Sequence, residues 1–177
     1  MSNPISVVEI NYEDDLVTAR QRARQVARLL TFEEQDQTRI STAVSEIARL
    51  FVHSKRPALI EFQIEGTTVP QLLLVDIGWP RGGSAKSGST LPPNSRTFDP
   101  EWESAVTSAR RLMDHGEVRS DSPEKSLIRL VKILPPRAPL FGGKALERVI
   151  KQLGKQEPQN PMEEVQQQNQ ELLRALQ

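Results

Sequence analysis

Glu46 and Leu50 lie one helical turn apart in the run Thr42-Ala-Val-Ser-Glu-Ile-Ala-Arg-Leu50. Of all segments in the sequence, this run comes nearest to a catalytic or metal-binding site in its residue types and spacing. Side chains four residues apart share one face of a helix, so a carboxylate and a metal ligand at this spacing can address the same pocket. Leu50, however, has no oxygen to offer a hard cation. The residues therefore predict a pocket with a carboxylate on one side and an apolar side chain at the metal position.

The sequence offers no other catalytic set. His53 and His115 are the only histidines, and neither has a partner at the spacing that a metal site or an activated nucleophile needs. No Ser-His-Asp set and no Walker-type phosphate loop can be assembled. With no cysteine among 177 residues, disulfides and thiolate metal sites are excluded, and a reducing cytoplasm is the expected setting.

The charge balance and the hydropathy exclude further classes of protein. Lysine plus arginine equals aspartate plus glutamate at 23 each, so no excess of positive charge points to nucleic acid or to an anionic membrane. The N-terminus lacks the pattern of a signal peptide, and the apolar runs are far too short for a membrane span. We therefore expect a cytoplasmic protein with no nucleic-acid partner and no membrane insertion.

The periodicity of apolar residues predicts the elements that would position Glu46. A helix is expected at 36–52, where Ile40, Val44, Ile47 and Phe51 form the buried stripe. Glu46 lies off this stripe, and Leu50 lies at its edge. The other helices are expected at 14–30, 101–115 and 144–153, and the strands at 5–10, 58–65, 72–75, 117–120 and 126–134.

Four arginines lie on the helix expected at 14–30, namely Arg20, Arg22, Arg24 and Arg28. They cover much of the surface that the apolar stripe leaves. A solvated helix face is the simpler interpretation, and an anion-binding face is the alternative.

Several motifs occur in the order found in the GHKL ATPase/kinase superfamily. The run from Asp36 to Arg49 matches almost continuously a motif that reads Ala-x-Ser-Glu-(Leu/Ile)-Ala-Arg-Asn, and the chain resembles in particular the anti-sigma-factor serine kinases of the RsbT type. The segment 13–20 is similar to the family's first helix, and 110–114 to the helix that follows the ATP lid. The resemblance covers residues 5–134.

The resemblance implies roles for individual residues. Glu46 stands at the position of the family's general base. Asp76 and Gly78 match the motif Asp-x-Gly-Pro-Gly, whose aspartate accepts a hydrogen bond from the adenine amino group, and Ser126 stands near a threonine that assists the adenine. These three are the expected nucleotide-binding residues if binding is retained. Leu50 replaces the asparagine that coordinates Mg²⁺, so no metal site is expected.

The glycine-rich lid that wraps the phosphates in this family is also missing. Residues 98–103 stand in its place, and Pro80 replaces the second glycine of the aspartate motif. Backbone amides without β-carbons allow phosphates to approach closely, which Pro100 and Trp102 cannot provide. The resemblance therefore implies a degenerate ATPase-like domain without a cofactor, and ATP and Mg²⁺ would be its cofactors only if kinase activity is retained.

The expected fold class is an α+β two-layer sandwich of the Bergerat (GHKL) type, in which an antiparallel-rich sheet carries helices on one face. We divide the chain into a GHKL-like domain at 1–135, a linker with a short helix at 136–161 and the start of a coiled-coil helix at 162–177. The repeat stops while still periodic, so we expect an output domain beyond Gln177. The core positions of the coiled coil, which are the expected dimerisation residues, are Met162, Val165, Asn169, Leu172 and Leu176.

Three functions remain open. The first is a regulatory protein-interaction and dimerisation module in bacterial signal transduction, a pseudokinase derived from an anti-sigma-factor serine kinase. The resemblance implies that such a homodimer docks to an antagonist of the STAS type or to a kinase or phosphatase output domain. The second is an active ATP-dependent protein-serine kinase of the partner-switching type. The third is a dimerisation domain with no ligand.

Overall fold

Helices and strands follow one another in the order β1, α1, α2, β2, β3, α3, β4, β5, α4 in the computed structural model, which describes residues 2–55, 57–78, 100–120, 126–155, 169–170 and 172–176. Their bounds are Ser2–Ile10 (β1), Asp14–Leu29 (α1), Glu34–His53 (α2), Ala58–Glu65 (β2), Leu72–Gly78 (β3), Pro100–Leu112 (α3), His115–Ser120 (β4), Ser126–Ile133 (β5) and Gly143–Lys155 (α4). None of the helices in these ranges is long and apolar enough to cross a membrane.

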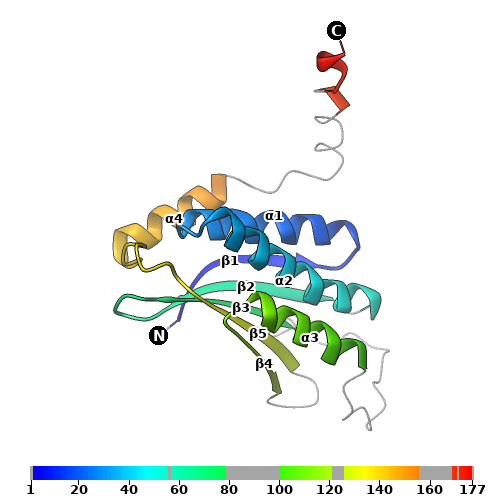
Figure 1. Cartoon of the computed structure of the whole chain (residues 1–177), viewed down its shortest axis with the longest axis horizontal. Helices are drawn as coiled ribbons and strands as arrows, with labels where there is room; N and C mark the ends of the chain where they lie inside the picture. The colour runs from blue at the N-terminus through cyan, green and yellow to red at the C-terminus, as the bar shows by residue number, and fades with distance from the viewer. Residues whose placement is uncertain are drawn as a thin grey trace.

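The strands form one antiparallel sheet in the order β1-β2-β3-β5-β4 (Figure 1). The last strand in the chain, β5, is therefore inserted between β3 and β4. Its register with β3 pairs Leu72 with Ile133 and Asp76 with Arg129. On the other side of β3, Asp76 is paired with Glu61 of β2. This register decides which side chains meet across the middle of the sheet.

Helices α1, α2 and α3 cover one face of the sheet, which confirms the predicted α+β two-layer sandwich (Figure 1). The alternation expected for β2 places its apolar residues in the core beneath these helices. Helix α1 contributes three small, fully buried side chains to the same core: Ala19, Ala23 and Ala27. Strand β3 is longer than the predicted 72–75, because it continues to Gly78.

An aromatic contact holds helix α3 against α2, and ion pairs of Lys132 link β5 to the start of α2 and to the segment after α3. The rings of Phe51 and Trp102 meet edge to face, with their centroids 5.0 Å apart. The ammonium group of Lys132 lies 3.7 Å from Asp36 in the first turn of α2 and 3.6 Å from Asp114 after α3. These contacts fix the separation of α2 and α3, the two helices that carry the candidate site.

The segment after β5 packs on the same core. Gln71 and Phe141 exchange two hydrogen bonds, since the Phe141 amide donates to Oε1 of Gln71 (2.7 Å) and Nε2 of Gln71 donates to the Phe141 carbonyl (2.9 Å). In addition, Arg22 donates from Nη1 to the Leu153 carbonyl near the end of α4 (2.7 Å). The segment's buried core residues are Ala138, Phe141, Val149 and Leu153. Residues 138–153 of the predicted 136–161 linker therefore pack on the domain.

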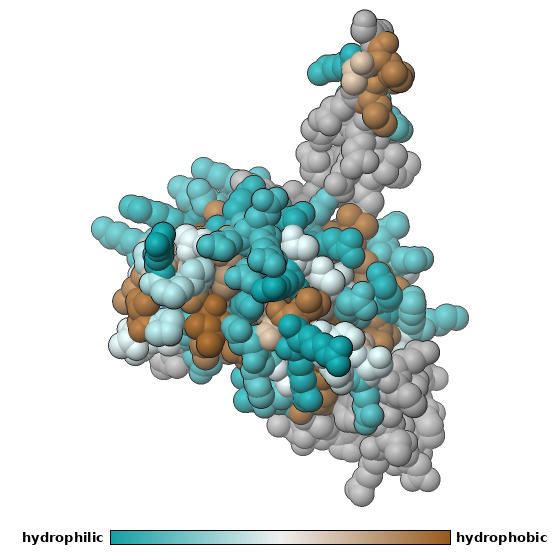
Figure 2. Space-filling view, in the orientation of Figure 1, coloured by the Kyte–Doolittle hydropathy of each residue, from teal (hydrophilic) through white to brown (hydrophobic). Residues whose placement is uncertain are grey.

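The predicted coiled coil falls mostly outside the described residues, including Met162 and Val165. Asn169 is helical and exposed, and a further helical turn begins at Leu172. Two core positions of the heptad repeat are strongly exposed, Leu172 at 62% and Leu176 at 83%. Figure 2 shows these apolar side chains as a separate brown cluster near the C-terminus. The coiled coil stays a prediction, and its apolar positions are available to a second helix.

Candidate functional site

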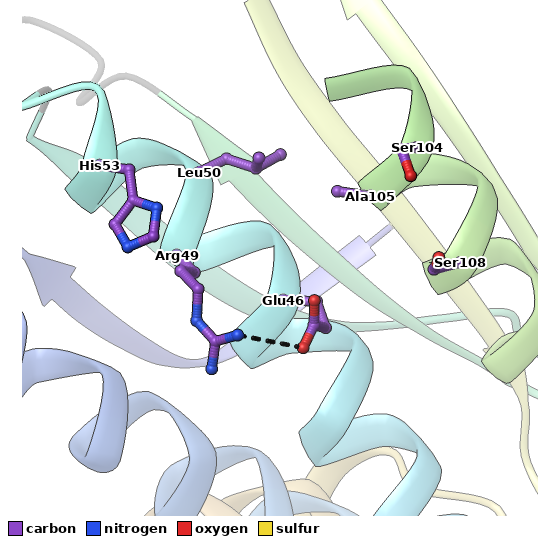
Figure 3. A pocket seen from close by; sticks show the side chains of 7 residues that line it. All are labelled: Glu46, Arg49, Leu50, His53, Ser104, Ala105 and Ser108. Carbon is purple, nitrogen blue, oxygen red and sulfur yellow. Dashed lines mark hydrogen bonds and ion pairs between the residues drawn. The ribbon is translucent and has the colours of Figure 1, made fainter. Parts of the chain in front are cut away.

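An open pocket of about 480 Å³ lies between α2 and α3 (Figure 3). Helix α2 brings Glu46, Leu50 and His53 to it, because spacings of four and three residues keep side chains on one face of a helix. The small side chain of Ala105 faces them from α3 and leaves room between the helices. The full lining is Glu46, Arg49, Leu50, His53, Ser104, Ala105 and Ser108.

Leu50 occupies the wall of this pocket next to Glu46. Its side chain points across the pocket toward Ala105 of α3 (Figure 3). The structure thus brings Glu46 and Leu50 together at one pocket, as the spacing predicted. A wall formed by the side chains of leucine and alanine offers no oxygen to a divalent cation.

The charged groups of the pocket are solvent-accessible. Arg49 lies 3.5 Å from Glu46, and about two fifths of each side chain is exposed (45% and 38%). In Figure 3 the guanidinium of Arg49 lies on the side of Glu46 away from Ser104 and Ser108. An ion pair of this length and exposure contributes little to stability. Nothing in the described ranges groups three His, Asp or Glu side chains in a way that could hold a metal ion.

Asp76 lies on the other face of the sheet. Val75 and Ile77 of β3 are fully buried in the core beneath the helices, and side chains alternate along a strand, so Asp76 points away from α2 and α3. There both of its carboxylate oxygens accept hydrogen bonds from Arg129, at 2.7 Å and 2.6 Å. The structure therefore does not bring Asp76 together with Glu46 and Leu50.

The Asp76–Arg129 pair is partly buried and joined by two short hydrogen bonds. The side chains are 11% and 18% exposed, respectively. The hydrogen bond to Asp76 raises the pKa of Arg129 above its ordinary value, against the opposing effect of burial. Glu117 lies beside Arg129 in the register of β4 and β5, and its pKa is lowered chiefly by a hydrogen bond from Arg119. A row of charged residues thus crosses this face of the sheet, with Arg129 between Asp76 and Glu117 and with Glu61 on the other side of Asp76.

The other residues assigned to the nucleotide lie at the ends of strands. Gly78 is buried at the end of β3, where it pairs with Leu59 and Leu127. Ser126 begins β5 and pairs with Ser120. The residues between Gly78 and Pro100, which include Pro80, lie outside the described ranges.

Arg129 and the two serines of α3 are site residues that the sequence did not predict. An arginine in the centre of the otherwise apolar run 127–131 was the available indication, because such a charge needs a partner on a neighbouring strand. Ser104 and Ser108 are four residues apart and therefore share a face of α3. Their position opposite Glu46 depends on how α3 packs on α2, which no local pattern specifies.

Comparison with known proteins gives one clear relative, although no family model matches the chain. The chain is 53% identical over 139 residues to the serine/threonine-protein kinase RsbT of Bacillus subtilis (strain 168). That alignment covers 75% of this chain and 98% of the relative. Such identity over nearly the whole length of a curated protein exceeds what a shared fold alone would give. The chain therefore belongs to the RsbT family of serine/threonine-protein kinases.

Proposed function

We infer that this chain is a regulatory protein-interaction and dimerisation module in bacterial signal transduction, derived from a serine kinase and defective in binding Mg-ATP. The observation that carries this inference is the position of Leu50 in the pocket between α2 and α3. Phosphoryl transfer depends on positioning and on neutralisation of phosphate charge, and a metal ion supplies much of that neutralisation. An apolar side chain beside Glu46 removes the ligand from the place where the metal would be needed.

Asp76 supports the same inference. An adenine amino group would have to displace Arg129 from a pair of short hydrogen bonds, at 2.7 Å and 2.6 Å. It would also have to reach the face of the sheet opposite Glu46. A nucleotide that contacts Asp76 and Glu46 together does not fit this arrangement.

Helix α3 adds a further argument. Residues 100–103 belong to a regular helix that continues to Leu112. These residues form the first turn, where amide groups have no partner within the helix, but Pro100 has no amide hydrogen and a regular helix cannot wrap around the phosphates as a glycine-rich loop does. Trp102 is in addition packed on Phe51. This part of the chain is therefore poorly suited to act as a phosphate lid.

The second candidate function is an active protein-serine kinase. It is favoured by the 53% identity to a protein named as a serine/threonine kinase and by the accessible carboxylate of Glu46 in the pocket. A kinase of this chain would need Mg²⁺ held by groups other than residue 50. The two functions differ in one measurable property, which is the affinity for Mg-ATP.

Calorimetric titration with ATP and ADP, with and without Mg²⁺, is expected to give no binding or only weak binding. Leu50→Asn alone should not restore it, because Asp76 and α3 keep their arrangement in that variant. Ser108→Asn, on the opposite wall, serves as the matched control for adding an amide to the pocket. A Mg²⁺-dependent dissociation constant in the low micromolar range for the natural chain would establish the kinase alternative instead.

The partners of this module are proteins. A domain that has lost its nucleotide chemistry can still compete for the surfaces that its relatives bind, so an antagonist of the STAS type and a kinase or phosphatase output domain are the proposed partners. We place this competition between partner proteins in the cytoplasm, because a chain without cysteine has no disulfide that the reducing conditions there could break.

Self-association is the other half of the proposed function. The exposed Leu172 and Leu176 lie one turn apart and would pack against a second helix, with Asn169 facing its counterpart across the axis. A buried pair of asparagines costs stability but disfavours other registers and higher oligomers. Two heptads are too short to associate alone, so the globular domain must contribute, through α1 or through the edge strand β1.

Light scattering is expected to show a dimer for the full chain and weaker association for a chain ending at Lys155. The truncation leaves α4 whole, so the melting temperature of the domain should be unchanged. Asn169→Leu is expected to retain association and to permit species larger than a dimer. A monomeric full chain at high micromolar concentration would exclude the homodimer, and an unchanged dimer after truncation would locate the contact on the globular domain.

A further inference from the structure

Three arginines form a ridge along α1. Arg20, Arg24 and Arg28 follow one another at intervals of four residues and are exposed. Positions with this spacing lie on one side of a helix, and at 1.5 Å per residue the ridge is roughly 12 Å long. We call these three residues the α1 arginine ridge. It lies along the seam with α2 on the outer face of the helix layer, which Figure 2 shows to be largely hydrophilic.

Two arginines of the ridge are held in place by neutral groups. Arg20 donates from Nη2 to the Ser45 hydroxyl at 3.3 Å, and Arg24 donates from Nη2 to the Thr38 hydroxyl at 2.9 Å. Neither forms an ion pair with a carboxylate of the described residues. Their positive charges are thus positioned by hydrogen bonds but not neutralised.

Other surface arginines of the domain are arranged differently. Arg39 pairs with Asp36, Arg49 with Glu46 and Arg119 with Glu117. Guanidinium groups that are fixed in space and still carry uncompensated charge need less ordering when a carboxylate binds. Because Arg20 and Arg24 are bonded to hydroxyl groups while these other arginines are paired with carboxylates, Arg20 and Arg24 are the candidates to contact an external anion.

The two ends of the ridge indicate what kind of anion fits. Asp14 begins α1 before Arg20, and Glu33 and Glu34 begin α2 just after the end of α1. Carboxylates near both ends limit the stretch of positive charge, which suits a short anionic segment better than a long polyanion such as a nucleic-acid backbone. The ridge repeats every four residues, or about 6 Å, which is also the spacing of carboxylates one turn apart on another helix.

We propose that the α1 arginine ridge docks a short acidic helix of a partner protein, with carboxylates at intervals of four residues. This rests on the proposed function only in that the chain acts by binding another protein. Exposed charge pairs govern the rate and specificity of association more than its strength, so the ridge would select which helix approaches α2 and in which direction. The pocket between α2 and α3 is not needed for this contact.

The test uses the full chain and a fluorescent 16-residue alanine-based peptide with glutamate at every fourth position. Fluorescence anisotropy at low salt is expected to show binding, and the same peptide with glutamines should bind at least fivefold more weakly. Replacing Arg20 and Arg24 together by glutamine should also weaken binding at least fivefold, a typical loss for two exposed charge pairs. Circular dichroism checks that the double variant is folded.

The matched control replaces Arg137 and Arg148, which are exposed outside the ridge, by glutamine. This variant has the same net charge as the ridge variant and is expected to bind the peptide within twofold of the natural chain. An equal loss in both double variants would show that only overall charge matters and would overturn the proposal, as would no loss in the ridge variant. The peptide-binding assay contains no nucleotide. Tight Mg-ATP binding in the calorimetric titration would therefore refute the proposed function but would leave the outcome of the peptide assay open.

Discussion

Replacing Asp76 by alanine is expected to lower the free energy of unfolding by about 3 kcal/mol, because removing one partner of a buried ion pair leaves the other charge uncompensated. The side chain of Arg129 is only 18% exposed, and its guanidinium makes two short hydrogen bonds to this carboxylate. Urea denaturation followed by circular dichroism measures the change. Glu117→Ala is the matched control, since the side chain of Glu117 is 36% exposed and lies in the same charged row, and the free energy of unfolding should fall much less in this variant.

Replacing both partners tests whether the effect belongs to the pair. In the double variant Asp76→Ala, Arg129→Met no buried charge is left alone, so much of the lost stability should return. A different result would change the role of Asp76. If Asp76→Ala left the stability unchanged but abolished a measurable affinity for ATP, the aspartate would be a nucleotide ligand and not a partner of Arg129.

Ending the chain at Pro135 is expected to unfold the domain or to reduce its stability by about 5 kcal/mol. The truncation removes Phe141, Val149 and Leu153 from the core, and each such side chain contributes roughly 1.5–3 kcal/mol when fully buried. It also leaves the buried side chain of Gln71 without the Phe141 backbone. A domain has only about 5–15 kcal/mol of stability in total, so this loss is comparable with all of it.

Thermal melts monitored by circular dichroism compare this chain with one that ends at Lys155. The longer chain keeps all of α4 and the hydrogen bond from Arg22 to the Leu153 carbonyl, so it should melt like the full chain. Phe141→Ala in the full chain is expected to fall between the two. If the chain ending at Pro135 melted normally, residues 136–161 would behave as the linker that the sequence predicted.

The helices and strands could be predicted because their apolar residues repeat with clear periods. The stripe of Ile40, Val44, Ile47 and Phe51 and the alternation in β2 both identify a buried face without any knowledge of the partner. The same reasoning placed Glu46 and Leu50 at one pocket, since their relative position depends only on the geometry of one helix. Local periodicity was therefore sufficient for features that depend on the geometry of a single helix or strand.

The orientation of Asp76 could not be predicted in this way. The run from Leu72 to Val75 is apolar at every position, so it contains no alternation to say which face of β3 packs beneath the helices. The face is set by the packing of Val75 and Ile77 beneath the helices, and the pairing of β3 with β5 then puts Arg129 directly opposite Asp76. The position of α4 could not be predicted either. The apolar face of an amphipathic helix shows that the helix packs on the domain, but it does not show on which elements.

The insertion of β5 between β3 and β4 has a consequence for synthesis of the protein. Of the described strands, β4 pairs with β5 alone, so it cannot join the sheet until β5 has been made. About 50 residues separate the end of β3 from the start of β5, which is a few seconds of translation at roughly 5–20 residues per second. During this time the growing chain carries one unpaired edge on β3. Residues 126–133 thus cover the exposed edge of β3 and attach β4 to the sheet, so until they emerge from the ribosome this edge is open to pairing with another chain.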